Sequence, residues 1–323
     1  MPGNPDIPKA VLRVLSKASA LETLRAIDAD QALRQRVLDM ETRFRERIST
    51  HVDGLPERSA PLSRFNTSPF VLMIYASQRH YSLISEIERD ILPAKLFSSM
   101  ETSAGRMVQT VVLPFYGWED VLSSMHSVRS VIDGRRRDGK ILRLATIKSG
   151  PRCLNDEMSK DIADDIVAHA EQWAQEDGVD HIEFSYGVLY GTEKTSNKKD
   201  WHVLRNIVEA KGTRFMLELP RLRWNCSFQH RGARVDVTVR IGTDWWQHLG
   251  GPTALIEVLV ALIRASVIPS EPEPANYPYQ VSDLGSIVCL DGIPVGYNVS
   301  LLQRGQLQWL FFLLSHYCDR LTD

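Results

Sequence analysis

Residues 131–150 read VIDGRRRDGKILRLATIKSG, and this stretch decides the fold. Two short β-prone runs, residues 126–133 and 140–148, lie on either side of a turn signal at Asp138-Gly139. An Asp-Gly pair between two such runs is typical of a tight β-hairpin. We therefore expect an antiparallel hairpin centred on this pair.

The elements after the hairpin predict the fold class. Residues 156–175 carry apolar side chains at helical spacing, and residues 182–191 form a mostly apolar run of the kind buried on both faces of a sheet. Further strands are expected within 213–241 and an apolar helix at 252–268. The order of hairpin, helix and strand indicates an α/β (α+β) protein with a mixed β-sheet flanked by helices.

The outer parts of the chain differ from this centre. Residues 8–50 have the spacing of two amphipathic helices, and the Pro- and Gly-containing segment 51–70 reads as a linker before a second helical region that reaches about residue 125. Near the C-terminus we expect a hairpin at 286–299 and a short apolar element at 307–318. The predicted division is an N-terminal helical arm (1–60), a core (61–268) and a C-terminal extension (269–323).

Composition excludes several classes of protein. With 323 residues, 43% of them hydrophobic and 24% charged, the chain has the composition of an ordinary soluble globular protein. It shows neither an apolar run of membrane-spanning length nor the layout of a signal peptide, so a cytoplasmic location is expected. The four cysteines form no C-x-x-C pair, so a structural zinc site or a disulfide framework is not expected.

The hairpin brings a chemically useful pair together. If the chain turns at Asp138-Gly139, the far ends of the two strands place Asp133 close to Lys148. A carboxylate that holds Mg²⁺, beside a lysine that positions or deprotonates a water molecule, is a layout used for phosphodiester cleavage. The same two residues also fit a surface hairpin with a solvated lysine, because an Asp and a Lys at this spacing occur often by chance.

A family resemblance favours the catalytic interpretation. The run at 131–150, the helix after it and YGVLYGTEKTSNKKDWHVLRNI (186–207) resemble the catalytic core of type II restriction endonucleases of the PD-(D/E)XK superfamily. The similarity is greatest to enzymes that cut a GG…CC palindrome with a degenerate centre, and it extends over about residues 100–265. It implies a restriction-endonuclease-like core that cleaves double-stranded DNA with Mg²⁺ as a homodimer, functionally paired with a DNA methyltransferase.

The resemblance also assigns roles to residues. Asp133 matches the metal-binding aspartate, Lys148 matches the catalytic lysine, and the backbone carbonyl of Ile147 matches a further metal ligand. Thr146 occupies the position, two residues before the lysine, where the family pattern has an acidic catalytic residue.

Some members of the superfamily with Ser or Thr at that position recruit a carboxylate from the following helix. The candidates here are Asp161 and Asp165, with Glu157 less favoured. Related enzymes also often place a Glu on the helix before the core, where this chain has Gln109 and Thr110. An enzyme lacking one ligand would bind DNA but cut it poorly.

Three basic segments are candidates for DNA contact. They are the hairpin tip, a polar loop after residue 191 and one face of a later strand, and each also fits a solvated surface. Lysine and arginine contact phosphates, whereas asparagine and lysine are among the types that read base edges. The candidates are Arg135, Arg136, Arg137 and Lys140 at the tip, Lys194, Asn197, Lys198 and Lys199 in the loop, and Arg221 and Arg223 on the strand.

Two alternatives to a restriction enzyme stay open at this point. One is a DNA-binding protein of the same fold whose catalytic site is degraded, as Thr146 suggests, and the other is a repair-type nuclease. The helices at 8–50 have no role in the catalytic core, and they are the hypothesised dimer interface or DNA clamp.

Overall fold

The computed structural model describes most of the 323-residue chain. The residues described are 10–53, 69–80, 83, 85, 86, 93, 106–121, 131–218, 223–230, 232–274, 276–294 and 300–323.

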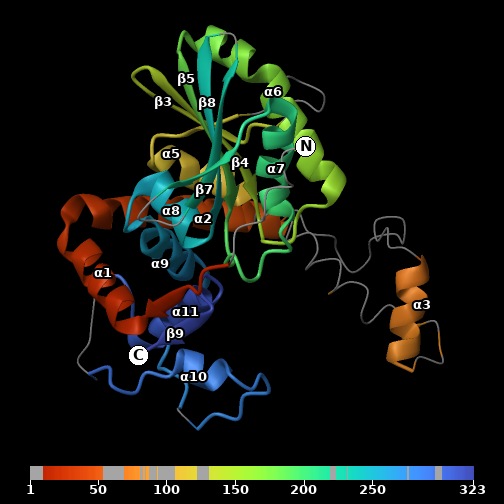
Figure 1. Ribbon diagram of the computed structural model, residues 1–323. Coiled ribbons are helices and arrows are strands. Elements are labelled where there is room, and N and C mark those ends of the chain that lie inside the picture. The colour runs from red at the N-terminus through yellow and green to blue at the C-terminus, as the bar shows by residue number, and fades with distance from the viewer. Residues whose placement is uncertain are drawn as a thin grey trace.

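A seven-stranded mixed sheet forms the centre of the molecule, in the order β2-β3-β4-β5-β8-β7-β6 (Figure 1). The inner strands β4, β5 and β8 run parallel to one another, and the outer strands pair antiparallel. The strands are β2 (Glu119–Asp120), β3 (Gly134–Asp138), β4 (Ile141–Lys148), β5 (His181–Val188), β6 (Phe215–Glu218), β7 (Arg223–His230) and β8 (Ala233–Ile241).

Helices α6 (Asp156–Asp177) and α7 (Lys199–Lys211) cover one face of the sheet (Figure 1). Helix α6 begins where the side chain of Asn155 accepts a hydrogen bond from the Met158 backbone N–H at 2.8 Å, and it ends at Gly178 in a left-handed conformation. Its apolar stripe, which includes Ile162 and Trp173, packs on the even-numbered residues of β4 and β5 in one hydrophobic core.

A second core lies on the opposite face of the sheet. It contains side chains from η2 (Val108–Val112), α8 (Thr243–Gly250) and α9 (Ala254–Ser266), together with the N-terminal helices and the C-terminal helix. Gly187 lets α8 approach β5 closely, since a Cβ atom there would lie 2.5 Å from the Trp245 ring. The remaining helices are α1 (Lys17–Ala29), α2 (Gln31–Asp53), α3 (Pro69–Gln78), α5 (Leu113–Phe115), α10 (Leu284–Val288) and α11 (Arg304–Ser315).

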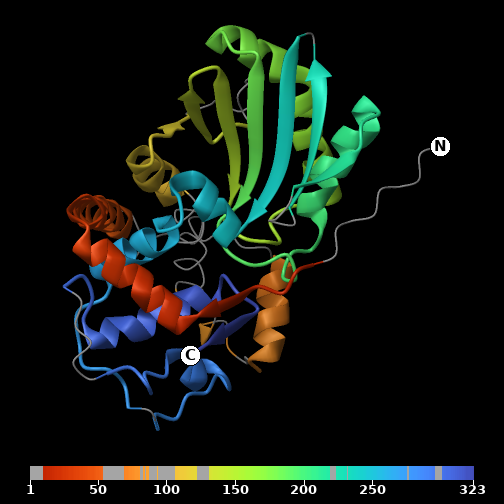
Figure 2. The same ribbon diagram turned by 60° about the vertical axis from the view of Figure 1, so that its left-hand side comes forward.

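A small two-stranded sheet joins distant parts of the chain. Strand β1 (Val14–Ser16) pairs in parallel with β9 (Arg320–Thr322), and both lie below the large sheet in the view of Figure 2. The buried ammonium of Lys17 donates to the carbonyls of Ser286 and Cys289 and to the carboxylate of Asp323, 3.1 Å away. These bonds attach the C-terminal segment to the start of α1.

The structure confirms a mixed α/β fold with a mixed sheet flanked by helices. It corrects the hairpin: β3 begins after Asp133 and contains the arginine-rich segment that was expected to be the turn. The reason is that the turn is only two residues long, since Asp138 pairs directly with Ile141 and Gly139 adopts a positive φ of 62°. Most of the predicted strand 126–133 lies outside the described residues.

The other predicted helices and strands are confirmed only in part. The helix after the hairpin, the strand at 182–191 and the apolar helix at 252–268 are confirmed within a few residues. Two N-terminal helices are also present, but the first begins only at Lys17, because residues 14–16 form β1. The predicted C-terminal hairpin is wrong where it is described, because residues 284–288 form α10. The linker at 51–70 falls largely outside the described residues.

The three predicted segments of the chain do not have separate cores. Leu24 and Met40 from the N-terminal arm, Leu259 from the centre and Phe311 from the C-terminal extension belong to one buried cluster. Within the part of the chain that the structure covers, no single helix is both long and apolar enough to cross a membrane.

Candidate active site

The candidate site is centred on Asp133, immediately before β3. Its backbone N–H donates to the carbonyl of Ala145 at 2.8 Å, and its Oδ2 accepts a hydrogen bond from the Ile147 backbone N–H at 2.6 Å. These two bonds fix the carboxylate against the last residues of β4. The sequence-based prediction that Asp133 lies beside the end of this strand is confirmed.

Three further side chains act on the Asp133 carboxylate. Burial raises its pKa, and the nearby charge of Asp120 acts in the same direction. The Ile147 N–H, the ammonium of Lys148 and a hydrogen bond from the side chain of Gln109 oppose this effect. Asp133 is therefore a partly desolvated carboxylate beside one lysine, one amide and one other acid.

Asp120 was missed by the sequence interpretation. It lies on β2 directly opposite Gly134, so the antiparallel pairing of β2 with β3 brings it next to Asp133. Burial raises the pKa of Asp120, and the positive charge of Arg47 on α2 lowers it. Strand β2 has only two residues, which is too few for a periodic hydrophobic pattern. The glycine in the preceding Tyr116-Gly-Trp indicates a turn, and this was the available sign that a new element begins here.

Thr146 occupies an interior position. Its side chain is 1% exposed, and its hydroxyl donates a hydrogen bond to the carbonyl of Val131. It therefore connects β4 to the segment that carries Asp133. This contact gives Thr146 a positioning role, and its hydroxyl hydrogen is already used.

A second pair of polar groups lies on the same face of the sheet, deeper in the core. Tyr186 on β5 is the register partner of Thr146, and Asp200 lies in the first turn of α7; both are fully buried. Burial raises the pKa of both groups, and a hydrogen bond between the Tyr186 hydroxyl and the Asp200 carboxylate raises the pKa of Tyr186 further and lowers that of Asp200. Asp133 also acts on Tyr186, so this pair adjoins the candidate site.

Asp200 is a buried acid with an altered pKa. Burial raises its pKa to about 6, while a 2.6 Å hydrogen bond from the Ser196 hydroxyl lowers it. In the sequence, Asp200 directly follows the polar loop that contains Lys194 and Lys199. Its position at the start of α7, followed by Trp201, turns it inward.

The structure does not bring Asp161 and Asp165 to Asp133. Asp161 is exposed on α6, and Asp165 lies 4.0 Å from His169 on the same helix. The charged groups that act on Asp133 are Lys148 and Asp120. Helix α6 directs its buried stripe at the sheet and these two carboxylates away from it.

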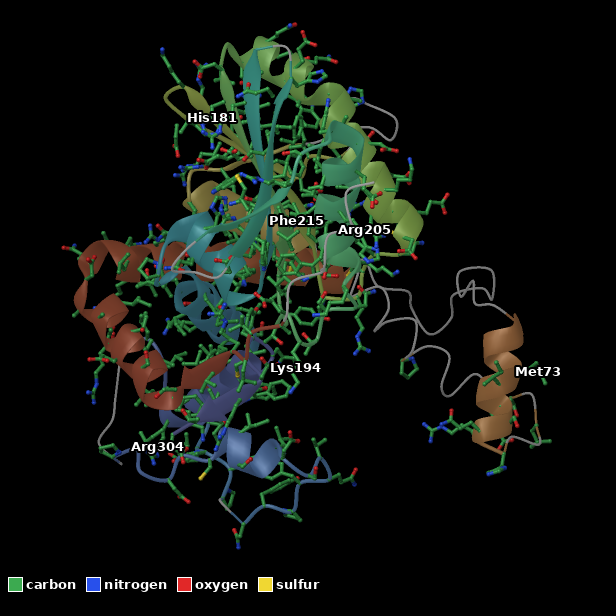
Figure 3. All side chains as sticks on the ribbon, in the orientation of Figure 1. Met73, His181, Lys194, Arg205, Phe215 and Arg304 are labelled. Carbon is green, nitrogen blue, oxygen red and sulfur yellow. The ribbon has the colours of Figure 1, made fainter. Side chains whose placement is uncertain are left out.

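The basic hairpin tip lies at the wrong end of β4 for the site. Lys148 lies seven positions after Ile141, which corresponds to about 23 Å at 3.3 Å per residue. Ile141 pairs with His181 at the start of β5, and Figure 3 labels His181 far from Lys194, which lies in the loop beyond the other end of this strand. The turn and Lys140 therefore lie far from Lys148, whereas Arg135 is only two residues from Asp133.

The tip residues have partners of their own. Arg135 contacts Glu119 and Asp177, at 2.9 and 3.2 Å. Arg136 pairs with Asp138 at 2.9 Å and lies over the Trp118 ring. Arg137 donates to the Gly139 carbonyl, and Lys140 is exposed in the turn.

The loop after β5 is held against the chain that follows Lys148. Asn197 donates its side-chain amide to the Leu154 carbonyl at 3.1 Å and accepts from the Lys199 N–H. Lys199 reaches Asp156, and Lys198 donates to the Glu193 carbonyl at 2.8 Å. Lys194 is exposed.

The remaining basic candidates are less well defined. Arg221 lies outside the described residues, and of Arg223 the structure describes the backbone, at the start of β7 opposite Glu218. The described residues contain no group of three or more His, Cys, Asp or Glu side chains arranged to hold a metal ion. All four cysteines are free.

Comparison with known proteins adds no support to the candidate site, which therefore depends on its geometry. No family model and no curated protein matches this chain.

Proposed function

We propose that this protein is a Mg²⁺-dependent endonuclease of the PD-(D/E)XK type that cleaves double-stranded DNA at a short palindromic site. The observation that carries the proposal is the Asp133 carboxylate, fixed by the Ile147 N–H at the end of β4, beside Lys148. A carboxylate and a lysine at the ends of adjacent strands are suited to phosphodiester hydrolysis.

The donor set suits a hard cation. Asp120 and Asp133 are neighbouring carboxylates, and both have a raised pKa, so a positive charge between them would offset their repulsion and desolvation. Mg²⁺ is commonly held by one or two protein carboxylates and retains several waters, which agrees with the pair available here. Asp133, Asp120 and the Ile147 carbonyl would hold the ion, which when bound would polarise the phosphate and acidify a water molecule.

The other residues would position the reactants. The ammonium of Lys148 would lie against the scissile phosphate and orient the attacking water. The side-chain amide of Gln109 holds the Asp133 carboxylate in place. Asp120 takes the role for which Asp161 and Asp165 were the sequence-based candidates.

The substrate and assembly follow from the same proposal. A palindromic duplex has two-fold symmetry, so two copies of the chain would each cut one strand as a homodimer. Lys194, at the edge of the sheet beyond β5, would contact the DNA backbone. Such an enzyme would work in the cytoplasm beside a DNA methyltransferase that protects the host's own sites.

Cleavage assays test the proposal directly. Purified protein is incubated with phage and plasmid DNA in Mg²⁺ or in EDTA, and the products are separated by gel electrophoresis. We expect discrete fragments from the wild type in Mg²⁺ alone. Asp133→Asn and Lys148→Met should each lower the cleavage rate by roughly 10²–10⁴-fold, because each removes a group that acts on the reacting phosphate.

Matched controls separate chemistry from folding. Asp39→Asn on α2 and Lys160→Met on α6 change the same residue types at exposed positions, and they should leave the rate unchanged.

Asp120→Asn should lower the rate as strongly as Asp133→Asn, and Asp165→Asn tests the rival carboxylate. Fragments that persist in Asp133→Asn would exclude this site, and unspecific degradation would favour a repair-type nuclease.

A second candidate is a DNA-binding protein that does not cut. Thr146 favours it, because the hydroxyl that replaces the family's acidic residue is buried and donates to Val131. Sequence-specific gel shifts without cleavage in Mg²⁺ would support this candidate.

A further inference from the structure

A cavity of about 380 Å³ lies apart from the candidate active site. It is enclosed by the residues before α1, α1 itself, the loop after β5, helices α8 and α9, and Leu314 of α11. Figure 2 shows the N-terminal strand passing below the sheet, beside the green loop that follows β5. Asp120, Asp133 and Lys148 do not line this cavity, so it is a separate feature.

The position of the cavity favours ligand binding. Ile241, at the carboxyl end of β8, and Gly191, just after β5, both line it. In open sheets, ligands bind outside the carboxyl ends of parallel strands. Its volume lies within the range of about 300–1,000 Å³ that is typical of small-molecule pockets.

The polar lining carries both signs of charge. Glu193 accepts a hydrogen bond from the Val11 N–H at 2.9 Å, and the charges of both Arg13 and Asp244 act on it. Burial raises the pKa of the Glu193 carboxyl, and the Val11 N–H and the charges of Arg13 and Lys198 only partly offset this effect. Asp244 lies 3.7 Å from the Arg240 guanidinium.

Trp201 adds an unsatisfied hydrogen-bond donor. Its side chain is 3% exposed, it lines the cavity, and its indole Nε1 has no hydrogen-bond partner among the described residues. A buried N–H without a partner is costly, and an acceptor oxygen on a ligand would satisfy it. The lining also includes apolar side chains, among them Leu255 and Leu314.

We propose that this cavity binds a free α-amino acid with an apolar side chain. The ammonium of the ligand would face Glu193, its carboxylate would face Arg13 and the Trp201 N–H, and its side chain would pack on Leu255 and Leu314. A ligand with only an ammonium would leave the two donors unmatched. A ligand with only a carboxylate would face Glu193 and Asp244.

Isothermal titration calorimetry on the full chain tests the proposal. The probes are L-leucine and L-phenylalanine, the amines that lack the carboxylate (3-methylbutylamine and 2-phenylethylamine), and the acids that lack the amine (4-methylpentanoate and 3-phenylpropanoate). At least one amino acid should bind with a Kd about tenfold or more below that of both its counterparts. Equal or tighter binding of an amine or an acid, or no binding of either amino acid up to about 10 mM, would overturn the proposal.

Two variants locate the binding site. In Glu193→Gln the amide oxygen still accepts from the Val11 N–H but carries no charge, so amino acid binding should weaken about tenfold or more. Trp201→Phe keeps an aromatic ring without the N–H and should weaken binding several-fold. Glu46→Gln changes an exposed glutamate on α2 and should bind like the wild type. Unchanged binding in both Glu193→Gln and Trp201→Phe would place the ligand elsewhere.

Discussion

Two buried polar groups lie near the candidate site. The Asp200 carboxylate and the Tyr186 hydroxyl are inside the core, and the charge of Asp133 acts on Tyr186. Burying such atoms lowers stability, and perturbed acids are more common at functional sites than elsewhere. The polar groups in this part of the core therefore lower the stability of the fold and provide a polar environment.

Replacing Asp200 with Asn should stabilise the protein above about pH 6. The folded-state pKa of Asp200 is raised from 3.8 to about 6, so the cost of ionising it is absent below pH 3.8 and complete above about pH 6. Two pKa units correspond to about 3 kcal/mol, which the neutral amide avoids while still accepting from Ser196. Urea unfolding should show this gain at pH 7.5 and no gain at pH 3.5.

The opposite pH dependence would contradict this account of Asp200. A variant less stable than the wild type at pH 7.5 would show that the ionised carboxylate has a partner, such as a bound cation. The measured quantity is the difference between variant and wild type at pH 7.5 minus the same difference at pH 3.5, so effects of the substitution that do not depend on pH cancel.

The sequence predicted part of the site at this scale. Asp133 and Lys148 were found because a short turn fixes the pairing between their strands. Asp120 was not found, because it comes from a two-residue strand, and Asp200 was not found, because the first turn of its helix continues a polar loop in sequence. Tyr186 lies in an apolar strand, where its hydroxyl does not alter the hydrophobic pattern.

Helix α2 is joined to the rest of the molecule by both apolar and polar contacts. Its apolar side chains Val37, Met40 and Phe44 are buried in the core that α9 shares. On the same side, Arg36 donates to the fully buried Glu257 of α9 at 2.6 Å, and Glu257 also accepts from the Tyr116 hydroxyl at 3.2 Å. The hypothesised dimer contact or DNA clamp would therefore use the charged outer face of α2.

Met40→Ala should destabilise the protein without changing its oligomeric state. Met40 is fully buried, so its truncation should cost about 2–5 kcal/mol through lost burial and the cavity left behind. Arg43→Ala, on the exposed side of the same helix, should change stability by less than about 0.5 kcal/mol. Chemical unfolding measures the stability, and light scattering measures the oligomeric state. A Met40→Ala variant that is as stable as the wild type but forms a smaller oligomer would contradict this prediction and indicate that Met40 lies in a dimer interface.

Element prediction succeeded where hydrophobic periodicity was long. Helices α2 and α6 span 23 and 22 residues and were found near their observed positions. Short elements were missed: β1 has three residues, and α10 was expected to be a strand. Such elements depend on distant partners, as β1 depends on β9, and a local pattern does not identify these partners.

At the scale of the whole molecule, the two hydrophobic cores have different roles. The core under α6 and α7 adjoins Tyr186 and Asp200, whereas the core on the other face joins α9 to segments from both outer parts of the chain. The fold class was predictable because strand and helix periods alternate. The sharing of one core by three segments was not, because it depends on contacts between residues more than 200 positions apart, such as Arg36 and Glu257.

The β1–β9 pair has a mechanical consequence. Val14 lies opposite Arg320 and Ser16 opposite Thr322, with the strands parallel. Tension applied before Val14 and after Thr322 would pull the strands in opposite directions along their length, so all the hydrogen bonds between them would bear load at once. An optical trap that holds the protein at residues 10 and 323 should therefore meet this small sheet in shear before α1 or α11 is stretched.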